Sequence, residues 1–452
     1  MSPYQKASLL LPPPTKDTIK RADYLKPLFE IFGINMLMNR FDYHILGKEW
    51  ANVTPSSWWI NKDRGFYTDG DAFPTNWIGH PFHGSLAFNA ARTHNVGFWA
   101  SVPYVASHTL LWEFFAETEP PSSIDFYTTT FGGIYLGEII YRLTNYTWNH
   151  PSNLNHPTLS NLVGGMINPV AAINRYAFNK KIPFSNQSLT PVSLVLYAGT
   201  NHPADKLLKG MKGMGLTMNF EMQYGELFDL NKSHFKPFDY FRLNTWVNFL
   251  DNSNTGQKEL YFNVSSDAII WGTKLTNLPY KTELISLSQH YDFIHNDRFK
   301  LGTIVLTGDW TIQKTYEKWR FYNATKMGVV IFGSGNSELV VPVMPEVFPE
   351  FERDYMYDQG FMIEAEMAAN FKKNGTFTLS YNHFLIYSNQ EPKGSENIDL
   401  IRSRFLLPVW TKMTLGLQFD YHKWKADYYN NAGFKKNYEG QKEIRFLVGY
   451  QF

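Results

Sequence analysis

From about Val192 to the C-terminus, apolar and polar residues alternate with a period of two. Successive side chains of a β-strand point to opposite faces, so this period predicts strands with one apolar and one polar face. Turn signals rich in glycine and asparagine separate the runs. The clearest runs are GLTMNFEMQY (215–224), FRLNTWVNF (241–249), FMIEAEMAANF (361–371), TFTLSYNHFLIY (376–387) and KMTLGLQFDYH (412–422).

These predicted strands are long, whereas strands of soluble domains usually have about five or six residues. A tilted strand needs about 9–11 residues to cross a bilayer, and its lipid-facing side must be apolar. Since lipid cannot hydrogen-bond to a free backbone amide, a spanning sheet has to close on itself. The charged residues that share the polar face are Arg242, Glu364, Glu366, Arg402 and Arg404.

We therefore expect an α+β protein in which residues 190–452 form a transmembrane antiparallel β-barrel of about 12 strands. The alternative is a large soluble β-sandwich or a lipocalin-like barrel, which accounts for the alternation but not for long strands with a charged face. The stretch Gly335–Gln359 is long and aromatic, and we expect it to be an extracellular loop.

The last nine residues carry the most regular apolar stripe, and the final residue is aromatic. This tail resembles the last strand of bacterial outer-membrane barrels, in which the stripe is the signal for the barrel-insertion machinery. The resemblance implies a location in the bacterial outer membrane, with outer-membrane lipids and that machinery as partners. The stripe consists of Ile444, Phe446, Val448, Tyr450 and Phe452.

Composition excludes several classes of function. A formal net charge of +1 gives no overall field for nucleic acid. The chain has no cysteine, so disulfides, thiolate metal sites and cysteine nucleophiles are excluded. No secretory signal is visible at the start, so we expect that the signal for export was removed or lies outside this numbering. We expect no cofactor.

The first part of the chain has a helical pattern instead. We divide it into an N-terminal extension (1–70) and a helical cap or plug domain (71–185). A Ser-x-x-Asp capping pattern at Ser122–Asp125 predicts the start of one helix, and glycines at 133 and 137 predict close approach of another helix to it. The helices are expected from about Phe82, over 98–117, from Ser122 to about Leu143, and over 161–178 with a break at Pro169.

The helical domain is expected on the periplasmic side, beneath the barrel or partly inside it. A barrel of about 12 strands is too narrow to hold all of these helices. Val96–Ala116 is apolar enough to lie in the membrane interface. We do not expect it to cross as a helix, because Pro103, His108 and Glu113 are costly in hydrocarbon.

These helices carry many polar residues for such an apolar setting. Arg92, Glu138 and Arg142 fit a buried network that ties helices together, since buried polar groups have to be paired. A second set could be structural in the same way, could hold a metal through its histidines and glutamates, or could perform acid–base hydrolysis. The members of this set, and the candidate catalytic residues, are His80, His83, Glu113, Glu117 and Asp125.

The segments GHPFHGSLAFNAAR and LLWEFFAETEPPSSIDFYTTTFGGIYLGEIIYRL, together with the barrel-type tail, resemble an uncharacterised family of Bacteroidota envelope proteins. That family is known as a domain of unknown function. The resemblance is clearest over Asp71–Leu143 and falls on Glu113 and Glu117, Pro121–Asp125 and Gly132–Glu138. A looser similarity links the helices to membrane-associated proteins of the VanZ-like kind.

Three functions remain open from the sequence. The first is a non-enzymatic barrel with a helical plug that serves as a subunit or accessory of a larger outer-membrane assembly, with outer-membrane or periplasmic proteins as partners. The second is a plugged channel or transporter for a small or lipidic solute. The third is a hydrolase that modifies envelope lipids. No recognised catalytic motif is visible, which favours the first.

Overall fold

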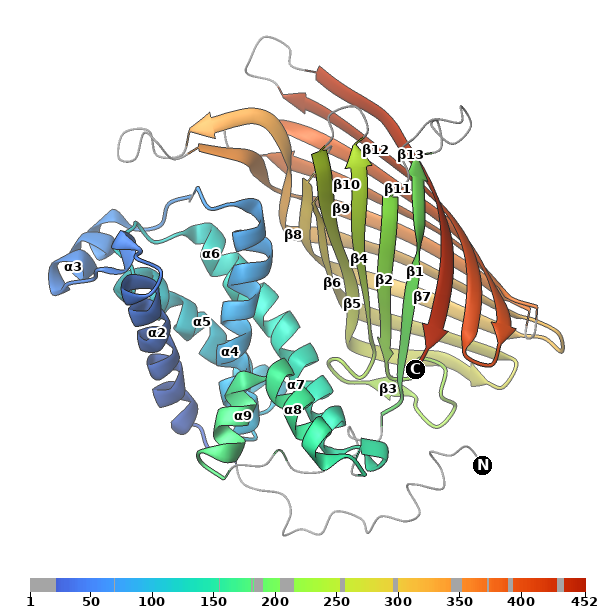
Figure 1. The fold of residues 1–452 in the computed structure, drawn as a ribbon, viewed down its shortest axis with the longest axis horizontal. Helices are drawn as coiled ribbons and strands as arrows, with labels where there is room; N and C mark the ends of the chain where they lie inside the picture. The colour runs from blue at the N-terminus through green and yellow to red at the C-terminus, as the bar shows by residue number, and fades with distance from the viewer. Residues whose placement is uncertain are drawn as a thin grey trace. The chain divides into compact units, whose positions relative to one another are not determined.

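The computed structural model describes the chain in two compact units, one helical and one a β-barrel (Figure 1). The first comprises Met1–Thr190 with Pro342–Arg353, and the second comprises Pro191–Val341 with Asp354–Phe452. The described residues are 22–68, 70–153, 155–179, 182, 190–203, 215–252, 257–295, 300–342, 352–371, 374–388, 393–428 and 435–452.

The helical unit confirms the predicted helices and extends them toward the N-terminus. A helix also covers most of residues 32–47, a stretch that fits either a helix or a strand in the sequence. The elements are α2 (Lys26–His44), η2 (Glu49–Ala51), α3 (Pro55–Arg64), η3 (Thr75–Gly79), α4 (His80–Thr93), α5 (Phe98–Phe115), α6 (Ser123–Tyr127), η4 (Thr128–Gly132), α7 (Gly133–Asn149), η5 (Pro151–Asn153), α8 (Pro157–Ile167) and α9 (Pro169–Tyr176). Among the described helices, none combines the length and hydropathy needed to cross a membrane.

Helices α4 and α7 meet almost backbone to backbone, as the glycines of α7 predict. A Cβ on Gly84 of α4 would overlap the carbonyl oxygen of Thr129, and one on Gly137 of α7 would overlap Phe88. A small core of alanines and a few larger side chains packs α4 against α2, α5 and α9. It contains Ile31, Ala87, Ala90, Ala91, Val96, Tyr104 and Val170.

The second unit is a closed antiparallel barrel, which confirms the predicted fold class. Thirteen strands are hydrogen-bonded in the order β3-β5-β4-β2-β1-β13-β12-β11-β10-β9-β8-β7-β6, and β5 also pairs with β6. β3 (His234–Phe235) pairs beside β5, and the other strands form the ring. They are β1 (Val192–Pro203), β2 (Gly215–Tyr224), β4 (Phe241–Asn252), β5 (Gln257–Leu278), β6 (Lys281–His295), β7 (Lys300–Thr315), β8 (Arg320–Pro342), β9 (Glu352–Asn370), β10 (Thr376–Ser388), β11 (Gly394–Trp410), β12 (Met413–Tyr428) and β13 (Lys435–Gln451).

The two faces of the barrel wall have opposite polarity. On β13, Phe446, Val448 and Tyr450 are exposed on the outer face, while Glu443 and Arg445 are buried on the inner one. Other strands repeat the apolar outer face, but the inner face also carries a buried apolar cluster that includes Leu301, Val330, Met356, Phe384 and Trp424. Outward-facing exposed residues include Leu216, Met218, Phe249, Leu260, Met327, Val329, Phe361, Ile363, Met367, Phe377, Phe405, Leu415 and Leu417.

One expectation about the connections is wrong. Most of Gly335–Gln359 is strand rather than loop, because β8 continues to Pro342 and β9 begins at Glu352. The aromatic residues Tyr355 and Tyr357 of this stretch belong to β9. The remaining connection, 343–351, lies outside the described residues.

Substituting Gly84 by alanine tests the close contact between α4 and α7. The new methyl group has no room beside Thr129, so Gly84→Ala should destabilise the helical unit by roughly 1–3 kcal/mol or more. The matched control is Gly33→Ala on α2, where a Cβ meets nothing within 4 Å. It should stabilise the unit by about 0.5–1 kcal/mol. Chemical unfolding followed by circular dichroism at the helical band measures both, and equal effects would contradict the packing.

Candidate functional site

His80, the first residue of α4, lies between two aspartates. Its Nε2 atom is 3.3 Å from Asp71 Oδ2 and 3.2 Å from Asp125 Oδ1. All three ligand-type atoms lie within 4.8 Å of one another. The side chains of His80 and Asp125 are 13% and 9% exposed, whereas that of Asp71 is 43% exposed. The group therefore reaches solvent through Asp71.

A short backbone bridge brings the two aspartates together. Tyr67 donates its N–H to Pro121 O at 2.7 Å, and Ser123 donates its N–H to Tyr67 O at 2.8 Å. The hydroxyl of Ser122 accepts from Asp125 N at 3.1 Å and caps α6, as the Ser-x-x-Asp pattern predicts. Two segments distant in sequence thus become neighbours through main-chain contacts.

Two π-helical turns flank this group. η3 (Thr75–Gly79) runs directly into His80, and η4 (Thr128–Gly132) follows the short helix that carries Asp125. The two turns also contact each other. A π turn inserts an extra residue and rotates the side chains that come after it, and such turns are rare except at functional positions. The π-helical turn η3 therefore sets the direction in which the His80 side chain points.

Two glutamates lie at the end of the neighbouring helix. Glu113 is on α5 and fully buried, and its Oε2 accepts from Ser122 N at 2.6 Å. Glu117 lies beyond the last residue of α5, Phe115, and has a pKa raised well above 4.5. The main cause is burial, and the negative charges of Glu113, Glu119 and Asp71 add to it. Glu117 is therefore held in its protonated form, and the surroundings carry excess negative charge.

Two histidine rings pack beside these acids. His83 contacts His108 edge to face with ring centroids 4.3 Å apart, and it contacts Trp112 at 4.7 Å. Burial lowers the pKa of His83 well below 6.5 and that of His108 to about 3. Both rings are therefore neutral at physiological pH.

Arg92, Glu138 and Arg142 form one buried network between α4 and α7. Glu138 Oε2 accepts from Arg92 Nε at 2.8 Å, and its Oε1 accepts from Arg142 Nε at 2.8 Å. The Arg92 guanidinium also donates to Val96 O at 2.7 Å and lies over the Tyr141 ring at 4.2 Å. Such a fully paired set fixes the packing of the two helices.

The candidate catalytic residues from the sequence fall into three subgroups. His80 and Asp125 meet directly. Glu113 and Glu117 interact, but the expected common helix face is wrong, because α5 ends at Phe115. His83 is in the same core, but it packs with another histidine. The five candidate residues therefore lie in one core, as a common site requires.

Two members of this core are missing from the sequence-based set. Asp71 stands in an irregular segment, and only the tertiary bridge at Tyr67 brings it to His80. His108 lies four residues before Trp112, so both side chains fall on the same face of an apolar helix. This pattern is the signal in the sequence that indicates His108 as a member of the core.

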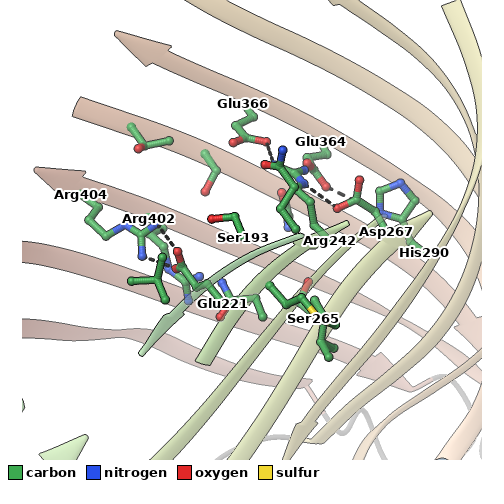
Figure 2. A pocket seen from close by; sticks show the side chains of 18 residues that line it. Ser193, Glu221, Arg242, Ser265, Asp267, His290, Glu364, Glu366, Arg402 and Arg404 are labelled. Atoms are coloured by element: carbon green, nitrogen blue, oxygen red, sulfur yellow. Dashed lines mark hydrogen bonds and ion pairs between the residues drawn. The ribbon is translucent and has the colours of Figure 1, made fainter. Parts of the chain in front are cut away.

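The barrel contains a second polar site, a cavity of ≈ 270 Å³ in its lumen (Figure 2). All five charged residues predicted to share a polar face line it. Asp267 and His290 come from strands whose alternation is less regular in the sequence, which is why they are missing from the predicted set. The charged and titratable lining residues are Glu221, Arg242, Asp267, His290, Glu364, Glu366, Arg402 and Arg404.

Ion pairs connect strands that are not neighbours in the ring (Figure 2). Arg242 on β4 donates to Glu366 on β9 at 2.8 Å, although β5, β6, β7 and β8 lie between them. Arg404 on β11 pairs with Glu221 on β2, across β12, β13 and β1. These contacts run through the lumen from wall to wall.

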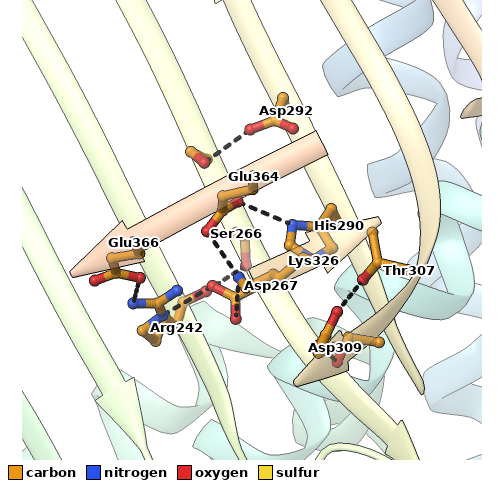
Figure 3. A network of polar contacts seen from close by, with 12 residues as sticks. Arg242, Ser266, Asp267, His290, Asp292, Thr307, Asp309, Lys326, Glu364 and Glu366 are labelled. Atoms are coloured by element: carbon orange, nitrogen blue, oxygen red, sulfur yellow. Dashed lines mark hydrogen bonds and ion pairs between the residues drawn. The ribbon is translucent and has the colours of Figure 1, made fainter. Parts of the chain in front are cut away.

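A lysine extends this network (Figure 3). Lys326 Nζ on β8 lies 3.4 Å from Asp267 Oδ2 on β5 and 3.0 Å from Glu364 Oε1 on β9. His290 Nδ1 on β6 is 3.9 Å from Glu364 Oε2. The middle of the lumen is therefore filled by mutually paired charges from several strands.

Comparison with known proteins adds the following. Residues 65–170 match the model of a family described as "Domain of unknown function (DUF3943)". No curated protein matches the chain. The matched segment contains the whole cluster around His80 and also Arg92, Glu138 and Arg142.

Several solved structures are similar to the barrel at low sequence identity. The outer membrane phospholipase A from Escherichia coli has 8% identity, covers 57% of this chain and 92% of its own, and has a TM-score of 0.29. An outer membrane channel from Pseudomonas putida F1 has 8% identity, 58% and 95% coverage, and a TM-score of 0.29. The porin NanC has 9% identity, 57% and 98% coverage, and a TM-score of 0.28.

The raised pKa of Glu117 predicts a pH dependence. Up to about pH 6.5 the buried, neutral His83 and His108 make the stability of the helical unit rise with pH. Above pH 4.5 the unfolded chain loses the Glu117 proton that the folded one keeps, so Glu117 adds a downward slope as pH rises toward its raised pKa. Glu117→Gln should remove this slope, which amounts to about 1.4 kcal/mol for each unit of pKa difference. Unfolding followed by circular dichroism between about pH 5 and about pH 9 measures it.

The control for this experiment is Glu49→Gln, at an exposed position of η2 in the same unit. It should keep the slope of the unmodified protein. An unchanged slope in Glu117→Gln would show that the pH dependence has another origin.

Proposed function

We propose that this protein is a bacterial outer-membrane β-barrel with a closed lumen, which acts as a subunit or accessory of a larger outer-membrane assembly. The observation that carries the proposal is the set of ion pairs between opposite walls, Arg242–Glu366 and Arg404–Glu221. A wide pore needs a lumen free of such contacts. A barrel that anchors another domain does not.

The polarity of the wall supports the membrane location. The outer face exposes rows of large apolar side chains, while the inner face holds arginine, lysine and carboxylate groups. In water this arrangement would expose apolar surface at great cost, whereas in a bilayer it satisfies both faces. Outer-membrane lipids are therefore the proposed surroundings of the wall, and the outward stripe of β13 is the proposed signal for the insertion machinery.

The connections support an orientation. Those at 279–280, 316–319 and 411–412 are short and lie at the end of the barrel where β1 begins and the chain terminates. Short turns and chain ends are periplasmic in bacterial outer-membrane barrels. The helical unit precedes β1 in the chain, which supports a periplasmic location for it. A role for these helices as a plug, and an origin in Bacteroidota, remain predictions.

The helical unit offers a surface for a partner. The outward face of α2 is apolar along its whole length, and its inward face carries Asn35 and Asn39, whose amides donate to the backbone of other segments. Beside this face lies a groove of ≈ 460 Å³, lined mainly by Phe32, Met36, Val53, Leu111, Trp58 and Phe115. A concave apolar groove next to a helical apolar stripe suits a protruding helix of another protein.

A second candidate function is a narrow passage for a small polar solute. The lumen cavity carries four carboxylates and three guanidinium groups, and such a lining suits a zwitterionic or neutral polar molecule. This function requires that the ion pairs between the walls open. The hydrolase alternative depends on the cluster around His80.

Conductance in planar bilayers tests the closed lumen. The unmodified protein should show only rare openings, and Glu221→Gln with Glu366→Gln should raise the open fraction, because the pairs that join opposite walls are lost. The matched control is Glu396→Gln, whose partner Trp424 lies on the next strand. Steady conductance of the unmodified protein would contradict the closed lumen and favour the second candidate function, a narrow passage for a small polar solute.

Purification from native membranes in mild detergent, with cross-linking and mass spectrometry, tests the assembly. We expect a stoichiometric partner with the unmodified protein and its loss with Phe29→Asn and Leu37→Asn on α2, which are 77% and 70% exposed. The control is Leu159→Asn with Met166→Asn on α8, also exposed and apolar. Partner loss in the control as well, or a lone unmodified protein, would contradict the proposed role.

A further inference from the structure

The arrangement of Asp71, His80 and Asp125 has the dimensions of a metal site. Metal–ligand distances for imidazole nitrogen and carboxylate oxygen are about 2.0–2.2 Å, so two ligand atoms on one ion lie roughly 3.0–3.4 Å apart. The nitrogen of His80 is 3.3 Å from one carboxylate oxygen and 3.2 Å from the other. The two carboxylate oxygens lie within 4.8 Å of each other, so an ion can contact all three atoms once the carboxylates close on it.

Two carboxylates compete for one ring nitrogen in this group. A neutral imidazole carries one N–H, and an N–H on Nε2 can point to only one acceptor in good geometry. Here two carboxylates approach the same nitrogen. A cation with several coordination positions accommodates both carboxylates and the ring lone pair together.

The surroundings also favour a cation. Glu113, Glu119 and Asp71 lie close enough to Glu117 for their negative charges to act on it. Negative charge gathered in this way attracts a divalent ion and is stabilised by it.

The backbone around the three residues is built to direct them. His80 and Asp125 each adjoin a π-helical turn, and the bridge at Tyr67 holds the segment that leads to Asp71. Close packing of Gly84 against Thr129 fixes α4, which carries His80, against η4, which follows the helix that carries Asp125. This is an independent sign of a functional position, since π turns persist chiefly where they orient functional side chains.

We propose that Asp71 Oδ2, His80 Nε2 and Asp125 Oδ1 bind a divalent transition-metal ion, with Zn²⁺ as the best match. One imidazole and two carboxylates suit Zn²⁺ or Mn²⁺ better than Mg²⁺, which prefers oxygen ligands only. Three protein ligands leave at least one coordination position open, and the exposed side of Asp71 gives access to it.

The open position defines the class of ligand. It can hold water or an anionic oxygen, such as that of a phosphate or a carboxylate group. This metal site is a property beyond the proposed role of the protein as a subunit of an assembly. Metal binding in the helical unit does not depend on whether the barrel lumen is closed.

The experiment uses the full chain in detergent, purified without a histidine tag and stripped with a chelator. Zn²⁺ alone is titrated by calorimetry, and bound metal is measured by elemental analysis. We expect about one equivalent of tightly held Zn²⁺, and roughly tenfold or weaker affinity in His80→Ala and Asp71→Asn. The control His156→Gln, exposed and in the same unit, should bind as the unmodified protein does.

A second readout separates binding from folding. Zn²⁺ should raise the unfolding temperature of the helical unit in the unmodified protein and in His156→Gln, but not in Asp71→Asn. Asp71 is half exposed, so its replacement leaves the core intact even where His80→Ala fails to fold. Binding below about a tenth of an equivalent, or binding that both ligand variants retain, would overturn the proposal.

Discussion

Hydrogen bonding of the barrel backbone is the constraint on which the rest of this structure depends. β5 pairs with β6 and β1 pairs with β13, so the ring has no free edge. Once the backbone is satisfied within the wall, neither face has to supply hydrogen-bond partners for it. The side chains are then free to adopt the inverted polarity seen here, with apolar groups outside and charges inside.

Inverted polarity in turn dictates the contents of the lumen. Charged groups inside a narrow barrel have little water around them, so they have to be paired with one another. Arg242, Lys326 and Arg404 each contact carboxylates on strands across the ring. The same pairs that solve the electrostatic problem also close the lumen, which connects the energetics of the wall to the proposed absence of a wide pore.

The helical unit follows a related principle on a smaller scale. Its core holds the Arg92–Glu138–Arg142 network and the cluster around His80, while large apolar side chains of α2 and α3 face outward. Polar groups in this core are fixed by partners rather than by solvent. Around His80 and Asp125 the polar group opens to solvent through Asp71, and this opening makes it the candidate for binding a ligand.

The sequence by itself determined the class of fold and the faces of the strands. A period of two repeated over long segments allows little except a barrel, and the stripe from Ile444 to Phe452 indicates which side is outside. The helix starting at Ser122 and the break at Pro169 were equally local, because caps and prolines act within a few residues.

Tertiary structure alone decided which of the polar residues meet. The segments that carry Asp71 and Asp125 meet through a backbone bridge although they are more than fifty residues apart, and Arg242 reaches Glu366 across the barrel. Parts of Gly335–Gln359 are strand because neighbouring strands supply pairing partners, as for Gly335 on β8 and Gln359 on β9. Pairing between distant segments depends on closure and register, and neither is written in any one stretch of the chain.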